Sequence, residues 1–377
     1  MSICLCMIVK NESSVIEKTL QNLVEKIPIQ YWVISDTGST DNTPSIITEF
    51  FKNKIPGELV HHEWKDFGYN RTKVLDSAFK KTDYVMMFDA DDYIEGVITI
   101  PTLTKDKYMA TFGTDVFKYN RPLFFTNKKK WYYTGVLHEY LDSPEPRTVE
   151  IIHGEYHVVS GRTGARNKNP NKYFDDAVVL AAAYEVERNE PLKRRYAFYC
   201  AQSFRDCNHK DKAIQWYLTC LSTPGYAQES YCASYELGNL YYSTNASNAA
   251  LHWCNSSIYD PERIEGIVRA VSMFYSQGNH IVVNALYHKW RGYSKVLANK
   301  LFLHSELYDY ELEYYNSISA YYVHDHSSGY TCCKEVILRC TNKHRVDQSI
   351  QNLRFFKPFL DKDKQFYNKV SKMGINI

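Results

Sequence analysis

The chain has 377 residues, of which 44% are hydrophobic and 23% are charged. This composition is close to that of ordinary globular proteins and excludes a disordered or fibrous chain, and the length suggests two or three domains. Lys and Arg together number 45 and Asp and Glu number 43, so the formal net charge of +2 gives no general attraction for nucleic acid or for an anionic membrane surface.

Ten cysteines occur without a Cys-x-x-Cys pair, which indicates reduced, buried thiols rather than a disulfide framework or a zinc site. The apolar start of the chain, residues 3–9, is too short for the core of a signal peptide and leads directly into Lys10 and Asn11. We therefore expect a cytoplasmic protein without a membrane span, whose fold begins at its first strand.

Residues 1 to about 165 alternate between short apolar runs and amphipathic stretches. The apolar runs predict strands at residues 3–9, 31–35, 58–62 and 84–88. The stretches with helical spacing of apolar residues lie between them, at residues 13–25, 43–51 and 70–80. Strands that alternate with helices of about ten residues indicate a parallel sheet with helices on both faces. Because ligands of such sheets bind outside the carboxyl ends of the strands, we expect a site there.

Three of the predicted strands end in polar residues. Residues 10–12 (Lys-Asn-Glu) follow the first strand, residues 36–41 (Asp-Thr-Gly-Ser-Thr-Asp) follow the second, and residues 89–92 (Asp-Ala-Asp-Asp) follow the fourth. Since the carboxyl ends of parallel strands meet at one edge of a sheet, these segments are expected to converge.

The acidic run at residues 89–92 follows an apolar strand. Carboxylates on one turn at the end of a buried strand raise one another's pKa, so their position favours a cation between them. Their oxygen atoms suit a hard divalent ion such as Mg²⁺ or Mn²⁺, which also binds a diphosphate. The alternative interpretation is an acidic surface turn in which Asp92 caps the following segment.

The loop after the second predicted strand leads into a helix that carries Pro44 in its first turn. Gly38 allows a tight turn and Thr43 is a suitable N-cap, and the free amides at a helix start favour an anion. An ordinary connection rich in capping residues would have the same composition.

Four segments that carry these motifs occur in a fixed order along the chain. They are residues 7–12 (Met-Ile-Val-Lys-Asn-Glu), 36–41, 69–71 (Tyr-Asn-Arg) and 88–92 (Phe-Asp-Ala-Asp-Asp). In this order they resemble glycosyltransferase family 2, whose members have the GT-A nucleotide-sugar-binding fold. The resemblance covers about residues 1–165 and implies an α/β domain with a Rossmann-like, mostly parallel sheet.

The resemblance implies roles for the residues at the first two strand ends. Val9, Asn11 and Glu12 would line the nucleotide pocket. Asp36 would form a hydrogen bond with the base or the ribose.

It also implies roles for residues farther along the chain. Arg71 would lie against the base or the diphosphate, with Asn70 supporting it. Asp89, Ala90 and Asp91 match the family's Asp-x-Asp signature. Asp89 would face the ribose or the donor sugar, and Asp91 would ligate, together with Asp89, the metal that bridges the two phosphates.

An inverting transfer also needs a carboxylate that accepts the proton of the attacking hydroxyl. Members of the family place this base in a Glu-Asp pair after a later strand, and the pair is missing here. The nearest match is residues 131–139, in which an aromatic strand containing Gly leads to His138 and Glu139. We predict Glu139 as the base, with Asp142 and Asp115 as alternatives and with His138 as a residue that could instead orient it.

Two further candidates lie near the end of this region. In GT-A enzymes a His after the last sheet strands often completes the metal shell, which makes His157 the candidate here; a His that serves packing alone is the alternative. The basic loop at residues 160–168 would close over the diphosphate through Arg162, Arg166 or Lys168. A solvated linker between domains would have a similar composition.

From about residue 170 onward the pattern is helical. We therefore predict a catalytic domain at residues 1–165 and an α-helical domain at residues 166–377. Alanines recur at near-constant spacing in two series, as in tetratricopeptide arrays with a period near 34: Ala197, Ala233 and Ala270, and Ala213, Ala250 and Ala285.

The resemblance implies a metal-dependent inverting glycosyltransferase that uses Mn²⁺ or Mg²⁺. It would move a sugar from a nucleoside-diphosphate sugar, with a UDP-sugar favoured, to a hydroxyl group of a glycan or protein acceptor. Nucleic acid is not expected as a partner, and a homo-oligomer formed through the helical domain is left open. Two alternatives stand beside this function: a helical interaction scaffold with a degenerate transferase domain, and a sugar nucleotidyltransferase.

Overall fold

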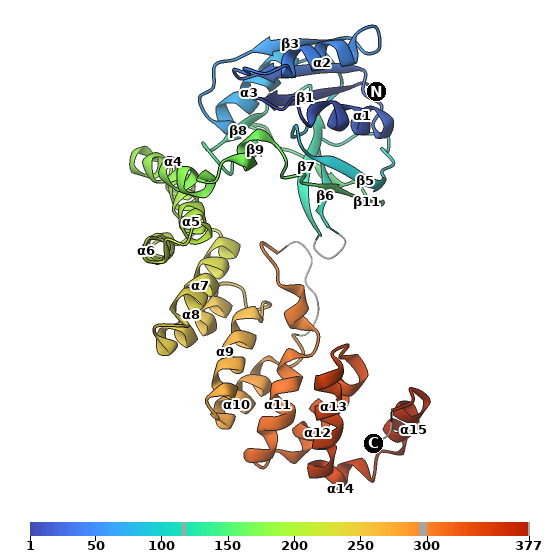
Figure 1. Ribbon diagram of the computed structural model, residues 1–377, viewed down its shortest axis with the longest axis vertical. Helices are drawn as coiled ribbons and strands as arrows, with labels where there is room; N and C mark the ends of the chain where they lie inside the picture. Colours follow the sequence, from blue (N-terminus) through green and yellow to red (C-terminus); the bar gives the residue numbers. More distant parts are fainter. Residues whose placement is uncertain (115–117, 294–299, 376–377) are drawn as a thin grey trace. The chain divides into compact units, whose positions relative to one another are not determined.

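A computed structural model describes residues 1–114, 118–293 and 300–375 of the chain (Figure 1). The chain divides into two compact units, Met1–His209 and Lys210–Ile377. The first unit contains the sheet and the second is helical. The predicted Rossmann-like sheet followed by helices is therefore confirmed.

The first unit is built on a mixed sheet, in which nine strands pair within the described part of the chain. The strand order is β3-β2-β1-β4-β7-β6-β11-β5, and β10 pairs with β6. The strands β3, β2, β1 and β4 are parallel, whereas β7 is antiparallel to both of its neighbours. The strands of this sheet are β1 (Ile3–Val9), β2 (Tyr31–Asp36), β3 (Gly57–His61), β4 (Tyr84–Met87), β5 (Tyr93–Val97), β6 (Lys107–Gly113), β7 (Lys118–Thr126), β10 (Val149–Ile151) and β11 (Glu155–Val159). A small separate sheet pairs β8 (Tyr132–Thr134) with β9 (Tyr140–Asp142).

Helices cover both faces of the parallel part of the sheet. Alternate side chains of a strand point to opposite faces, so β1 contributes Leu5 to one core and Cys6 to the other. Helices α1 (Ile16–Lys26) and α2 (Thr43–Phe51) pack on the Leu5 face, and α3 (Phe67–Ala78) packs on the Cys6 face. A strand that is buried on both faces must be apolar throughout, which explains the continuous apolar run that predicts β1.

The start of α3 differs from the predicted helix at residues 70–80. The helix begins at Phe67 because Asp66 caps it, and the Asp66 carboxylate accepts a hydrogen bond of 2.7 Å from the Tyr69 amide. The helix was predicted from the spacing of its apolar residues. This spacing does not include the residues of the first turn, 67–69, so it places the start of the helix too late.

The first unit continues past the predicted domain boundary after residue 165. It includes η1 (Ala165–Lys168), α4 (Lys172–Val186) and α5 (Glu190–Asp206). Helix α5 is tied to the sheet half because the amide of Val136 donates to the Tyr196 hydroxyl at 3.1 Å. The predicted boundary thus lies within the first compact unit, where the chain changes from strands to helices.

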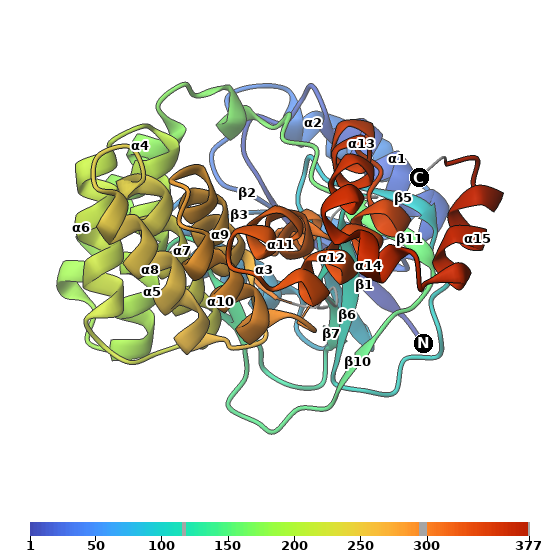
Figure 2. The ribbon, with the colours of Figure 1, turned by 90° about the horizontal axis from the view of Figure 1, so that it is seen from below.

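The second unit consists of helices that pack on their neighbours in the sequence. Within the described residues they are α6 (Lys210–Leu221), α7 (Ala227–Tyr241), α8 (Ala246–Tyr259), α9 (Glu265–Ser276), α10 (His280–Trp290), η2 (Ser305–Tyr308), α11 (Glu311–Tyr322), α12 (His326–Arg339), α13 (Lys343–Asn352), η3 (Leu353–Phe356), α14 (Lys357–Leu360) and α15 (Lys364–Lys372). Figures 1 and 2 show α7 beside α8 and α11 beside α12. Gly238 permits the first contact, since a Cβ atom there would lie 2.3 Å from the Trp253 ring.

Only one of the two predicted alanine series lies at buried positions throughout. Ala197 on α5, Ala233 on α7 and Ala270 on α9 are all completely buried. The other series begins with the buried Ala213 but ends with Ala285 on the exposed side of α10. The first series therefore marks close helix contacts, and the second does not continue.

The ten cysteines all lie within the described residues and carry thiol groups; seven of them are buried and three are half-buried. Within the described parts of the chain, no helix has both the length and the apolar composition that crossing a membrane requires.

Candidate active site at the strand ends

The carboxyl ends of β2, β1 and β4 lie side by side, because these three strands are parallel neighbours in the sheet. Val9 at the end of β1 is the direct neighbour of Asp36 at the end of β2. The predicted convergence of the three polar segments is therefore present.

The loops after β1 and β2 are bound to each other. The carbonyl oxygen of Val9 accepts hydrogen bonds from the amide and the hydroxyl of Thr37, at 2.9 and 3.0 Å. Asn11 has a left-handed φ of 59°, which Asn tolerates better than most residues, and its side chain accepts a bond of 2.7 Å from the Thr40 amide. The Asn11 amide in turn donates to the Ser39 hydroxyl at 2.9 Å. Val9 and Asn11 thus hold the loops after β1 and β2 together at this edge of the sheet.

Asp36 is buried, and the loop that follows it binds its carboxylate. It accepts bonds from the amides of Gly38 and Ser39 at 3.2–3.3 Å. On its other side the Nδ1 atom of His61, the last residue of β3, lies 3.5 Å away.

Arg71 lies at the centre of the site, on the first half of α3. Its Nη2 atom is 2.5 Å from Asp89 Oδ1 and its Nε atom is 2.7 Å from Glu139 Oε1. The guanidinium also lies 5.7 Å from the centre of the Tyr133 ring. Burial alone would lower the pKa of Arg71, but the two carboxylates raise it above its ordinary value. One buried cation therefore joins the acidic motif after β4 to the predicted base.

The start of α3 holds the segment that leads to the predicted base Glu139. Gly68 lets this segment approach, since a Cβ atom there would lie 2.3 Å from the carbonyl oxygen of Gly135. The amide of Tyr133 donates to the Thr72 hydroxyl at 2.9 Å. On the other side of Gly135 the amide of Phe67 donates to the Val136 carbonyl at 3.1 Å, so contacts on both sides hold the segment that leads to Glu139.

Asn70 is completely buried, but its amide does not point toward the arginine that it was expected to support. Its Oδ1 atom accepts the amide of Lys65 at 2.9 Å, and its Nδ2 atom donates to the Glu63 carbonyl at 3.0 Å. Adjacent residues of a helix point in different directions, so Asn70 fixes the loop between β3 and α3 while Arg71 faces the site.

The acidic motif contains carboxylates in two different electrostatic states. Burial would raise the pKa of Asp89, but Arg71 and then Arg121 outweigh it and lower that pKa. Burial together with Asp89 and Asp91 raises the pKa of Asp92 to about 7. Ala90 between them is buried. The motif therefore contains one carboxylate, Asp89, whose charged form is stabilised and another, Asp92, whose neutral form is favoured.

Asp91 and Glu12 are bound by the main chain of the loop that follows β11. Asp91 Oδ2 accepts the amides of Thr163 and Gly164 at 3.1 and 2.9 Å, and Glu12 accepts the amide of Ala165 at 3.2 Å. A Cβ atom at Gly164 would lie 3.0 Å from Asp91 Oδ2 and from Glu12 Oε1. Burial, with a smaller effect of Asp91, raises the pKa of Glu12 to about 7. The two carboxylates thus converge under three successive amides.

Residues 4–174 match the family model "Glycosyl transferase family 2". They form a glycosyl transferase family 2 domain.

The chain is also similar to known proteins outside this family model. The chain is 31% identical to a TPR repeat-containing protein of Synechococcus elongatus over 91 residues. These 91 residues are 24% of this chain and 20% of that protein. The chain thus spans about a fifth of the length of this curated relative. Among solved structures, S. aureus TarS 1-349 is 13% identical, with a TM-score of 0.37 over 68% of this chain and 91% of that chain. The mannosyltransferase PcManGT from Pyrobaculum calidifontis is 14% identical, with a TM-score of 0.31 over 68% and 86%.

Three basic residues of the loop after β11, Arg162, Arg166 and Lys168, were the candidates for binding phosphate, and Lys168 donates to the Ser14 hydroxyl at 3.3 Å. Arg166 instead forms an ion pair with Asp176 on α4, and its guanidinium lies 4.6 Å from the Phe67 ring. Arg162 is exposed and has a left-handed φ of 50°. Arg162 is therefore better placed than Arg166 to meet a ligand.

His157 lies in the ladder between β11 and β5, away from the acidic motif. It is the direct neighbour of Glu95, and its Nε2 atom lies 3.4 Å from that carboxylate. Asp91 precedes β5 and contacts the loop after β11. The predicted ligands His157 and Asp91 are therefore not brought together. Within the described residues of the family 2 domain, no three His, Cys, Asp or Glu side chains are grouped to hold a metal ion.

The predicted alternatives to Glu139 have different surroundings. Asp142, the last residue of β9, forms an ion pair with Arg147. Asp115 lies outside the described residues.

Several residues at the site of the family 2 domain have no sequence signal. Arg195 on α5 donates two bonds of 3.0 Å to the carbonyl of His138, and the His138 ring stacks on Tyr199 at 3.9 Å. Desolvation, followed by the effect of Arg195, lowers the pKa of His138 below its ordinary value. Arg121 on β7 lies 4.0 Å from Asp89. These contacts depend on packing between segments that are distant in the sequence.

Proposed function

We propose that this protein is a metal-dependent inverting glycosyltransferase that uses a nucleoside-diphosphate sugar, with a UDP-sugar favoured, and a hydroxyl acceptor on a glycan or protein. Two observations support the proposal: the family 2 domain, and the gathering of its motif residues at one edge of the sheet. The observation that carries it is the bridge from Asp89 through Arg71 to Glu139, which links the donor motif to a carboxylate.

The donor would lie across the ends of β2, β1 and β4. Asp36 would bind the nucleoside, while Val9 and Asn11 would shape the pocket beneath it. Asp89 would face the ribose or the sugar. Because Arg71 is already bound by two carboxylates, its role is to position them, and direct contact with the base is the less suitable role.

The acidic motif fits a hard divalent cation in its donor chemistry, since Asp91 and Glu12 offer only oxygen atoms. A protein often supplies one or two carboxylates to Mg²⁺, and the phosphates and water supply the remaining ligands. Such an ion, Mn²⁺ or Mg²⁺, would neutralise the charge that develops on the diphosphate leaving group. Asp91 would be its main protein ligand, and His157 would contribute only after a rearrangement of its ladder.

Glu139 would accept the proton of the acceptor hydroxyl as this oxygen attacks the anomeric carbon. Arg71 fixes the orientation of the Glu139 carboxylate. His138 beside it, stacked on Tyr199, would shape the acceptor side of the pocket.

The amides of residues 163–165 donate hydrogen bonds to Asp91 and Glu12. When the diphosphate binds, the loop would exchange these contacts for phosphate oxygens, and the exposed Arg162 would pair with them. The helical unit would select the acceptor.

The experiment is a thermal-stability measurement with UDP, GDP and other nucleotides, with and without Mn²⁺. We expect one diphosphate to stabilise the protein only with the metal, and the effect to disappear in Asp91→Ala. An assay with the matching sugar nucleotide would then detect release of the diphosphate. No stabilisation by any nucleotide would favour an interaction scaffold, and release of pyrophosphate from a triphosphate and a sugar phosphate would favour a nucleotidyltransferase.

A further inference from the structure

The last residue of β3, His61, places an exposed imidazole beside Asp36, the residue proposed to bind the nucleoside. His61 is the direct neighbour of Asp36 in the β2–β3 ladder, and its Nδ1 atom lies 3.5 Å from Asp36 Oδ2. The His61 side chain is 69% exposed, whereas that of Asp36 is 5% exposed. A ligand bound at the Asp36 carboxylate would therefore have this exposed ring close by.

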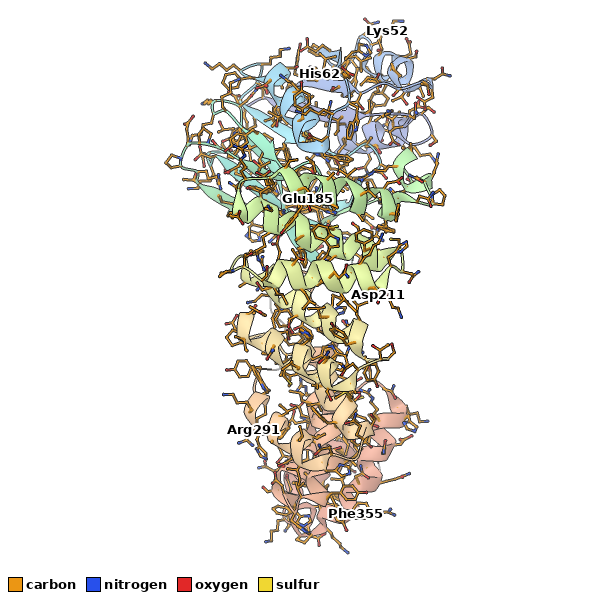
Figure 3. The ribbon with its side chains drawn as sticks, turned by 90° about the vertical axis from the view of Figure 1, so that its left-hand side faces the viewer. Lys52, His62, Glu185, Asp211, Arg291 and Phe355 are labelled. Atoms are coloured by element: carbon orange, nitrogen blue, oxygen red, sulfur yellow. The ribbon has the colours of Figure 1, made fainter. Side chains whose placement is uncertain are left out.

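The backbone and the neighbouring residue hold His61 in this place. The amide of His62 donates to the Asp36 carbonyl at 3.1 Å, and the His62 Nδ1 atom lies 2.8 Å from the hydroxyl of the buried Ser35. His62, labelled in Figure 3, is thus anchored to β2 while His61 faces outward. The buried Asn70 amide fixes the next part of the loop. The exposed ring is therefore carried on a well-bound segment.

The chemistry of the ring decides which part of a donor it can contact. A neutral imidazole has one donor and one acceptor nitrogen and a flat aromatic face, and these suit the edge or the face of a nucleobase. The carboxylates that would bind the metal, and through it the diphosphate, are Asp91 and Glu12, which follow β4 and β1, whereas β3 lies on the far side of β2. His61 is therefore placed away from the phosphates.

We propose that His61 contacts the nucleobase of the donor and contributes to the choice of nucleotide. This inference rests on the proposed function, because it takes the ligand at Asp36 to be a nucleoside diphosphate. It adds a residue that none of the sequence motifs includes.

The test measures binding by calorimetry on the full chain in Mg²⁺, with UDP, GDP and inorganic pyrophosphate as ligands. In His61→Ala we expect the affinity for the preferred nucleoside diphosphate to fall about tenfold, the scale of losing one ring contact with a base. The affinity for pyrophosphate should stay unchanged, because this ligand has no base. The matched control is His153→Ala, which removes another exposed histidine of the first unit.

The melting temperature of His61→Ala should equal that of the wild-type protein, since the side chain is exposed. Unchanged nucleotide affinity in this variant would overturn the inference, and so would an equal loss for pyrophosphate. If the wild-type protein itself bound no nucleotide, the proposed function would fail before the variant was considered. The two failures are therefore distinguishable.

Discussion

Each unit of this protein contains an arginine buried against carboxylates, but the two arrangements differ in charge balance. In the helical unit Arg263 is 1% exposed and Glu265 is 0% exposed, and their side chains lie 2.6 Å apart. The hydroxyls of Tyr231 and Tyr308 donate to the other oxygen of Glu265 at 2.7 and 2.6 Å. This pair is complete within the protein.

At the strand ends the charges are not balanced in this way. Arg71 serves both Asp89 and Glu139, while Asp92 has a pKa raised to about 7 by burial and by its acidic neighbours. The comparison teaches that a buried ion pair alone does not identify a site. Carboxylates in excess of their cations, gathered at the ends of parallel strands, are the stronger sign of a place for a charged ligand.

The largest expected effect is in the helical unit. Arg263→Met should lower the free energy of unfolding by about 3–5 kcal/mol, because it leaves the Glu265 carboxylate buried without its partner. Urea unfolding followed by circular dichroism measures the loss. The double variant Arg263→Met with Glu265→Leu should recover most of it, and a double variant as unstable as the single one would contradict this account.

Arg71→Lys should affect catalysis more than folding. Lysine keeps the positive charge but cannot bind two carboxylates through separate nitrogens, so Glu139 would lose its fixed position. We expect release of the nucleoside diphosphate from its sugar donor to slow about 100-fold, the scale of a small misplacement of a catalytic group. The matched control is the exposed Arg188→Lys, and an unchanged rate in Arg71→Lys would exclude the bridge as a functional element.

Gly164→Ala should release the loop at residues 163–165 from the carboxylates. The added methyl group would lie 3.0 Å from oxygens of both Asp91 and Glu12, so the amides must move away. We expect hydrogen exchange of these amides to speed up about tenfold, equivalent to about 1.4 kcal/mol. Exchange measured by mass spectrometry checks this, with Thr163→Ala as the control, and equal protection in both variants would count against the contact.

The smallest expected effect is a difference in acid stability. Burial would raise the pKa of Glu265, but Arg263 and the two tyrosines outweigh it, so its folded pKa lies below the usual 4.5. The stabilisation from this group is therefore present above pH 4.5 and is lost as the pH falls through the lower folded value. The double variant at 263 and 265 should show a shallower loss of stability in acid than the wild-type protein. Parallel slopes for the two proteins would contradict the prediction.

The sequence predicts the sheet half well because its signals are local. Continuous apolar strands and the polar residues after them are visible in short windows, and parallel order then brings Asp36 and Asp91 to one edge. Arg71 joins them from α3 through its ion pair with Asp89.

The rest of the site depends on packing that local patterns cannot reveal. Arg121 reaches Asp89 only because β7 is antiparallel to β4, and His61 reaches Asp36 through the register of β3. Arg195 comes from a helix more than fifty residues beyond its partner His138. Periodicity and composition contain no information about these long-range pairings.

The contacts over Asp91 and Glu12 come from the peptide backbone of consecutive residues. The spacing of the chain, more than the identity of its side chains, therefore determines whether they form. A one-residue insertion or deletion between Arg162 and Arg166 would shift every N–H group out of alignment. Homologous proteins could vary freely in the amino acids used here, apart from the small residue at 164, and would still be held to the same loop length.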